Sequence, residues 1–338
     1  MIVVAFLLLV AMLGVYVLLD GYDLGAGAVH LFVARDDAER AAVLDSIGPY
    51  WNGNEVWLIA AGGTLFALFP QVYASSFSGF YLPFMVLLWL LMFRGIAFEL
   101  RGEFPSDLWR GFFDVTFAAA SVLLILVLGV ALGNIVRGVP LDTAHYFQGT
   151  FAFLLNPYAV GVGLLAVAAL TQHGAAWVAA RVDGPPAARA QAALRILWPL
   201  VLVLTAIVTI ATFAVHSPLP NLRAMPAIAL APLCSAAGLA GVALFALQRR
   251  PRRVFEASTL FLAGLLASSA ATLYPYLLPG YPAPETGLSI FNAPAPSAAL
   301  QTILPIAIGG LLIVVAYRSF VGLRLNAGRA KSEPADLP

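Results

Sequence analysis

Two carboxylates, Asp20 and Asp23, directly follow the apolar run of residues 1–19, which is long enough to cross a bilayer. They lie on one face of a helix together with Gly27. A carboxylate at mid-membrane costs roughly 2.5–3.5 kcal/mol, so it must face protein or water, and it commonly belongs to an ion or proton path. The alternative is that both acids reach the membrane surface at the helix end and hydrogen-bond to backbone there. The glycines beside them favour the first interpretation, because they let a second helix come close.

The stretch from Tyr50 to Pro70 begins with polar and aromatic residues and then becomes apolar. Trp51 and Trp57 are typical of the headgroup level of a membrane, and we interpret them as interface anchors. Asn52 and Glu55 lie beside them at the mouth of the apolar run and are candidates for a proton path. The alternative is a helix cap, because amides are good N-cap residues and an acid suits a helix N-terminus. The two roles do not exclude each other.

A third polar group, in residues 93–101, ends the apolar run 76–98. Arg94 and Arg101 are spaced two helical turns apart and therefore share one helical face. We interpret them as counter-ions for nearby acids and as interface anchors rather than as a clamp for a substrate. Glu99, in the same segment, joins the candidate proton-path residues.

Composition identifies the class of protein. Hydrophobic residues make up 61% of the chain and charged residues only 10%. The mean hydropathy is +0.91, far above that of soluble proteins. The net charge of +1 gives no indication of a nucleic-acid partner, and the single cysteine, Cys234, excludes a disulfide within the chain. We therefore expect lipid, and no nucleic acid, around this protein.

Apolar stretches separated by Pro, Gly and charged residues predict nine transmembrane helices, at residues 1–19, 55–69, 76–98, 112–136, 151–180, 194–215, 224–247, 254–278 and 299–321. Of the 18 Lys and Arg residues, all but Arg137 and Arg223 lie in alternate connections, near helix ends on the same side, or in the C-terminal tail. The positive-inside rule then places the N-terminus outside and the C-terminus in the cytoplasm. The predicted fold class is an all-α, polytopic integral membrane protein.

This orientation gathers the acids and arginines of the first four helices near the cytoplasmic side. We expect one transmembrane domain, 1–321, with a polar, motif-bearing half (1–180) and an apolar half (190–321). Two four-helix groups plus one extra helix would account for nine spans, although no repeat is visible in the sequence. Residues 322–338 are small and polar and predict a disordered cytoplasmic tail.

The four histidines lie in separate segments, and no two share a helix: His30, His145, His173 and His216. Of these, His30 and His173 both approach the cytoplasmic side and could face each other as haem ligands. The dispersed pattern instead favours a chain that ligates no cofactor or metal. No Walker A motif, Rossmann glycine pattern or zinc-ligand spacing occurs in the sequence.

The first half of the chain resembles subunit II of the cytochrome bd-type quinol oxidases. The matching segments keep the family's order: DGYDLGAG (20–27), SIGPYWNGNEVWLIAAGGTLFALFPQVYASSFSGFY (46–81), FRGIAFELR (93–101), GNIVRGVP (133–140) and LLNPYAVG (154–161). The tryptophan-rich segment and its acid are specific features. The second half fits by helix count and by LYPYLLP (273–279) only.

The resemblance implies a multi-pass protein of the bacterial cytoplasmic (inner) membrane that pairs with a haem-bearing subunit I. Such a complex oxidises quinol and reduces dioxygen to water, and it takes the chemical protons from the cytoplasm without pumping. Haems b and d and the quinol-recognising loop belong to subunit I. The resemblance therefore implies neither a catalytic residue nor a haem ligand in this chain.

The resemblance also implies that this subunit lines a proton route along the subunit boundary. Asp20 matches the acid that the family places on that route. A second family acid often occupies the position of Asn52, so this sequence departs from the pattern there, and Glu55, one turn later, is the candidate substitute. Whether a structural quinone lies in this subunit, and whether a small single-helix accessory subunit joins it, stays open.

A stand-alone secondary transporter coupled to protons or cations is the alternative function, because its helices are also interrupted by Gly and Pro. Transporters built of repeats place their acids at corresponding points of both halves, whereas the acids here are concentrated in the first half. Co-purification with a haem-bearing partner would distinguish the two functions.

Overall fold

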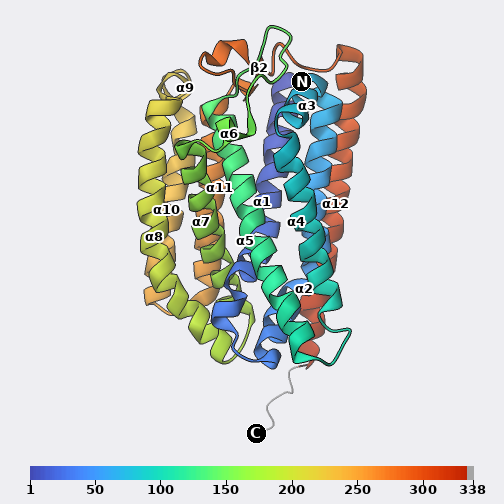
Figure 1. Cartoon of the computed structure of the whole chain (residues 1–338), viewed down its shortest axis with the longest axis vertical. Helices are drawn as coiled ribbons and strands as arrows, with labels where there is room; N and C mark the ends of the chain where they lie inside the picture. Colours follow the sequence, from blue (N-terminus) through green and yellow to red (C-terminus); the bar gives the residue numbers. More distant parts are fainter. Residues whose placement is uncertain (333–338) are drawn as a thin grey trace.

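The computed structural model describes the backbone of residues 1–332 and the side chains of residues 1–316. It confirms the all-α fold class (Figure 1). Within the described residues, the helices of 18 or more residues are α1 (Ile2–Val33), α2 (Asp37–Leu68), α4 (Tyr81–Leu100), α5 (Asp107–Arg137), α7 (Pro157–Arg181), α8 (Pro185–Val215), α10 (Leu230–Leu247), α11 (Pro251–Leu273) and α12 (Ser297–Ser332). The shorter elements are α3 (Pro70–Gly79), α6 (Phe151–Leu154), α9 (Leu219–Ala224), η1 (Pro226–Ala229), β1 (Tyr276–Leu278), η2 (Pro284–Thr286) and β2 (Leu288–Ser289).

Eight of the long helices, all but α2, are long and apolar enough to cross a membrane within the part of the chain that the structure describes. The N-terminus and the end of α12 lie at opposite ends of the bundle, as an odd number of crossings requires (Figure 1). That α2 also crosses, that the N-terminus lies outside, and that the helices form two four-helix groups plus one stay predictions.

The second helix differs from its predicted extent. α2 begins at Asp37 rather than at residue 55, because the Asp36 side chain accepts a hydrogen bond from the Glu39 amide and caps the helix there. Asn52 and Glu55 therefore lie in the interior of a continuous helix. The interpretation of these two residues as a helix cap is wrong.

The C-terminal segment also differs from its prediction. We expected disorder from residue 322, whereas α12 continues to Ser332. Leu, Arg, Ala and Lys, which have high helix propensity, are frequent in residues 323–331 and favour this continuation. Residues 333–338, the rest of the predicted tail, lie outside the described residues.

The glycines of α1 allow α7 to pack directly on its backbone. A Cβ atom added to Gly25 would lie 1.9 Å from the Leu170 carbonyl oxygen, and one added to Gly174 would lie 2.0 Å from the Gly25 carbonyl carbon. Only hydrogen fits in these positions, so the two helices touch through glycine. This contact fixes the position of the helix that carries Asp20 and Asp23.

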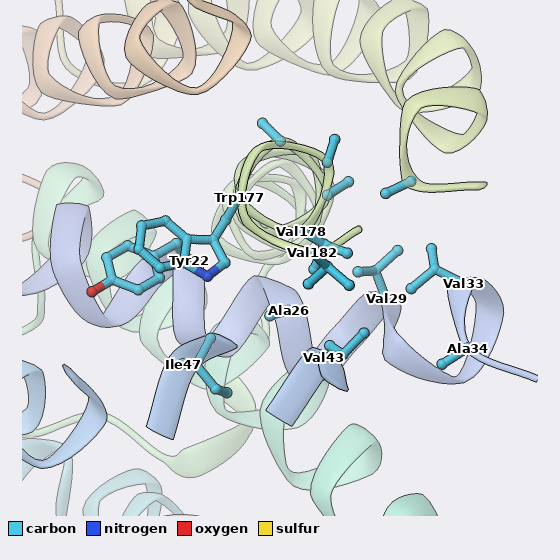
Figure 2. Close-up of a cluster of buried hydrophobic side chains, with 14 of the residues drawn as sticks. Tyr22, Ala26, Val29, Val33, Ala34, Val43, Ile47, Trp177, Val178 and Val182 are labelled. Atoms are coloured by element: carbon cyan, nitrogen blue, oxygen red, sulfur yellow. The ribbon is translucent and has the colours of Figure 1, made fainter. Parts of the chain in front are cut away.

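A hydrophobic cluster joins α1, α2 and α7 beside this crossing (Figure 2). Tyr22 stacks on Trp177 with ring centroids 4.0 Å apart. Val29 of α1, Val43 of α2 and Val178 of α7 pack in the same cluster and are almost fully buried. The end of α1 and the first turns of α2 are therefore held by apolar contacts on one side.

Reporter fusions test the predicted orientation. Fusions after Arg110 and after Arg253 should both report the cytoplasm, because both follow arginine-rich connections, and a fusion after Arg137 should report the outside as the matched control. An outside signal at Arg110 or at Arg253 would contradict the orientation that brings the acids to the cytoplasmic side.

Candidate functional site

Arg94 of α4 is fully buried and lies between two acids from other helices. Its Nη2 atom is 3.1 Å from Asp20 Oδ1 of α1, and its Nη1 atom donates a hydrogen bond of 2.8 Å to Glu55 Oε1 of α2. The rings of Trp51 and Phe117 lie against the guanidinium, with centroids 5.5 and 5.9 Å from its Cζ atom. Arg94 is therefore the shared counter-ion of the two acids, enclosed by aromatic rings.

Asp23 lies one turn beyond Asp20 and is also fully buried. The Asn54 amide donates to Asp23 Oδ2 at 2.6 Å, to the Tyr22 hydroxyl at 2.8 Å and to the Leu19 carbonyl at 3.2 Å. Asn54 thus ties α2 to the acid-bearing face of α1.

These groups place more acids than cations in a buried part of the protein. Two carboxylates, those of Asp20 and Glu55, pair with one guanidinium, and the buried carboxylate of Asp23 lies one turn beyond Asp20. If all three were ionised the group would carry excess negative charge, which low-dielectric surroundings disfavour. Neither oxygen of Asp20 accepts a hydrogen bond from the side chains that the structure describes, although it is paired in charge with Arg94. We name the group of Asp20, Asp23, Glu55 and Arg94 the Arg94 cluster.

A second charged group lies at the end of the same helices and centres on Asp114 of α5. Its carboxylate accepts hydrogen bonds from Arg101 Nε at 2.6 Å and from Arg40 Nη1 at 3.1 Å. Arg101 also donates to Asp37 at 2.7 Å. The Asp114 group therefore connects α2, α4 and α5, and Arg101 acts as the counter-ion that its position predicts.

A smaller charged contact joins α2 to α8. The Arg35 backbone amide donates to Glu39 Oε2 at 2.7 Å, and Arg189 of α8 pairs with Glu39 Oε1 at 2.5 Å. The hydrogen bond from the Arg35 amide, followed by the Arg189 guanidinium, lowers the pKa of Glu39 below its ordinary value. Glu39 therefore links α2 to α8 through its ion pair with Arg189.

The structure separates the predicted site residues into two sets. Asp20, Asp23, Glu55 and Arg94 come together, and Arg101 lies two turns further along α4. Asn52 and Glu99 are instead exposed on the surface of this chain, on α2 and α4. The predicted anchors Trp51 and Trp57 are almost fully buried in the protein and do not face the membrane surface.

Several residues of the site were missing from the sequence prediction. Asn54, rather than Asn52, faces the acids, and the signal for it was the helical spacing Trp51, Asn54, Trp57, Ala61, all of which are buried. Tyr16, one turn before Asp20, also lies within electrostatic reach of that acid.

His30 and His173, the two histidines that could face each other as haem ligands, both lie against polar partners within this chain. His173 Nε2 donates to the Leu18 carbonyl at 3.2 Å and its Nδ1 accepts from the Ser258 hydroxyl at 3.0 Å, which accounts for both nitrogens of a neutral ring. His30 lies 3.3 Å from the Gly27 carbonyl and 3.4 Å from Asp114. Both nitrogens of each ring therefore face a polar atom of this chain. No group of three or more His, Cys, Asp or Glu side chains could hold a metal ion within the described part of the chain.

Comparison with known proteins identifies the family and the fold of this chain. The sequence profile described as cytochrome bd terminal oxidase subunit II matches residues 1–322. This chain belongs to that family. It is therefore a subunit of an oxidoreductase complex and a multi-pass protein of the bacterial inner membrane, and its family supports the oxidase over the transporter.

Individual relatives agree with the family assignment. This subunit II is 30% identical to the probable cytochrome oxidase subunit 2 of Haemophilus influenzae, over 88% of this chain and 87% of that protein. It is 29% identical to the cytochrome bd-I ubiquinol oxidase subunit 2 of Escherichia coli K12, over 89% and 88%. The solved bd oxidase of Geobacillus thermodenitrificans has the same fold, with a TM-score of 0.77 and 21% identity over 96% of this chain and 98% of that chain.

The buried position of Arg94 predicts a large loss of stability when its charge is removed. Arg94→Met leaves Asp20 and Glu55 without their counter-ion, and breaking a buried pair in this way costs about 3–5 kcal/mol. We expect a lower yield and a lower Tm of the purified complex. The control is Arg110→Met, because Arg110 forms a largely solvated pair with Asp37, which is worth at most about 1 kcal/mol. Equal losses of Tm in the two variants would contradict the role of Arg94.

Proposed function

We propose that this subunit II supports the haem-bearing subunit I and carries protons from the cytoplasm toward it through the Arg94 cluster. The observation that carries the proposal is the pairing of two acids, from two helices, with one fully buried guanidinium, with the buried Asp23 one turn away. Oxygen reduction consumes protons, so a membrane-embedded oxidase needs ionisable side chains that deliver them. The Arg94 cluster supplies such side chains.

The two acids that pair with Arg94 differ in their exposure. The Asp20 side chain is fully buried, whereas 27% of the Glu55 side chain is exposed. In this proposal, a proton bound by the acids near Arg94 leaves through Glu55 to the protein that covers α2. Glu55 is therefore the proposed exchange point, and it takes the part that an acid at the position of Asn52 has in other members of the family.

The exposed polar residues support a partner on this face. Asn52 of α2 and Glu99 of α4 are exposed on the surface of this chain, and Asn52 lies one turn from Glu55. Polar side chains are unfavourable against lipid, so a covering protein would stabilise them. We propose that subunit I covers this face and that Asn52 and Glu99 line the proton route at the boundary.

The engaged histidines support a division of labour within the complex. Both ring nitrogens of His30 and of His173 already face polar partners. We therefore propose that haems b and d and the site of quinol oxidation lie in subunit I. A structural quinone and a small single-helix accessory subunit are further proposed components, and neither requires a histidine of this chain.

Replacement of the acids tests the proton path. Asp20→Asn should slow oxygen consumption per haem at least about tenfold, because a positioned acid–base group commonly contributes that much or more. Glu55→Gln should slow it less, if Asn52 and water already complete part of the path. The measurement is oxygen consumption per haem in membranes. Glu103→Gln is the control, because Glu103 is an exposed acid outside the cluster.

A structural acid would give a different result. Its replacement would reduce the amount of assembled complex and leave the activity per haem unchanged. Normal activity per haem in Asp20→Asn, in Glu55→Gln and in the double variant would therefore contradict the proton path.

Replacement of the histidines tests the location of the haems. Single changes to Ala at His30, His145, His173 and His216 should leave every haem band in the spectrum of the complex intact. His173→Ala should still lower stability, because it removes the hydrogen bonds to Leu18 and Ser258. Loss of one haem band at full assembly, in any of the four variants, would assign a haem ligand to this chain.

A further inference from the structure

The turn between α10 and α11 carries a group of arginines that the proton path does not use, namely Arg249, Arg250, Arg252 and Arg253. Among the described residues, no ion pair includes any of them, whereas five other arginines pair with acids, namely Arg40, Arg94, Arg101, Arg110 and Arg189. All four are exposed. They therefore form a local surplus of positive charge at the lower end of the two helices in Figure 1.

Two of these arginines open into a cavity of about 520 Å³ between α10 and α11. Its charged end is lined by Arg252, Arg253 and Glu256, and its apolar end includes Ala237, Gly241 and Leu260. Ala237 and Phe245 both line it and are eight residues apart, so the cavity extends about 12 Å along α10. It is thus an elongated groove that is charged at one end and apolar at the other.

The start of α11 adds to the attraction for an anion. The first turn of α11 contains no acidic residue, and no side chain caps it. Free backbone amides and the helix dipole give a helix N-terminus partial positive charge. Arg252 and Arg253 lie in this same turn, so side chains and backbone favour a negative group at one place.

Arg253 is also held in position at the groove. Its Cζ atom lies 5.6 Å from the centroid of the Phe245 ring, which is within the range of a cation–π contact. A guanidinium that stacks by its face keeps the N–H groups at its edge free to donate. Phosphate oxygens accept such hydrogen bonds in a paired geometry.

We propose that the α10–α11 groove binds an anionic glycerophospholipid such as phosphatidylglycerol. The lipid phosphate lies at Arg252 and Arg253, and one acyl chain lies along the apolar end, where Ala237 and Gly241 leave room for it. Two arginines against one acid, Glu256, give the charged end net positive charge, which favours an anionic headgroup over a zwitterionic one. The site goes beyond the proton path and lies on different helices.

Native mass spectrometry of the purified complex with added lipid tests this site. Arg252→Gln with Arg253→Gln should weaken phosphatidylglycerol binding about tenfold or more, since each arginine near a lipid surface contributes about 1 kcal/mol. The matched control, Arg249→Gln with Arg250→Gln, removes the same charge outside the groove and should change binding less than about twofold. Equal weakening in the two double variants would overturn the proposal, because it would indicate diffuse surface charge.

The groove itself is tested by filling it. Ala237→Phe should exclude the acyl chain and weaken binding, whereas Ala236→Phe, at an exposed position outside the groove lining, should not. Phosphatidylcholine should bind the unchanged complex more weakly than phosphatidylglycerol, and inorganic phosphate should not displace the lipid. Equal binding of the two lipids, displacement by inorganic phosphate, or normal binding in Ala237→Phe would each overturn the proposal. An unchanged haem spectrum shows that every variant is assembled.

Discussion

The polar half of this protein depends on the burial of the Arg94 guanidinium. A guanidinium that is fully buried is stable only when acids neutralise its charge. In the same way, a buried carboxylate is stable in its charged form only beside a cation. Asp20 from α1 and Glu55 from α2 supply the acids at 3.1 and 2.8 Å. The ion pairs therefore join three helices. In the proposed proton path, the atoms that stabilise the fold are also the ones that would exchange protons.

The backbone contact between α1 and α7 determines where those acids lie. Gly25 and Gly174 touch, so α1 cannot shift along α7 without a steric clash. Asp20 and Asp23 lie within two turns of that contact, on the helix that it fixes. The glycines of the DGYDLGAG segment are thus part of the site, although they carry no side chain that reacts.

The sequence alone predicted that the chain is a membrane protein, which family it belongs to, and that the acids of its first half lie near one another. These predictions depend on composition and on short motifs. The sequence was insufficient for α2, where helix-forming polar residues before residue 55 extend the helix to a cap at Asp36. The sequence also did not show that Asn54 faces Asp23 while Asn52 is exposed. Which of the two asparagines faces α1 depends on the rotation of α2 against α1, which only the tertiary contacts determine. The burial of Trp51 and Trp57 depends on the same rotation.

The apolar half contributes to the site through packing rather than through charge. His173 of α7 is neutral in its hydrogen-bond pattern and links Leu18 of α1 to Ser258 of α11. Its ring stacks on Phe255 with centroids 4.7 Å apart, and Phe255 also contacts Tyr22. Leu18 lies only two residues before Asp20. The hydrogen bonds of His173 therefore help to hold the acid-bearing part of α1 in place relative to α11. The ionisable groups are concentrated in the first half of the chain. The contacts with α11, in the second half, nevertheless help to position the Arg94 cluster.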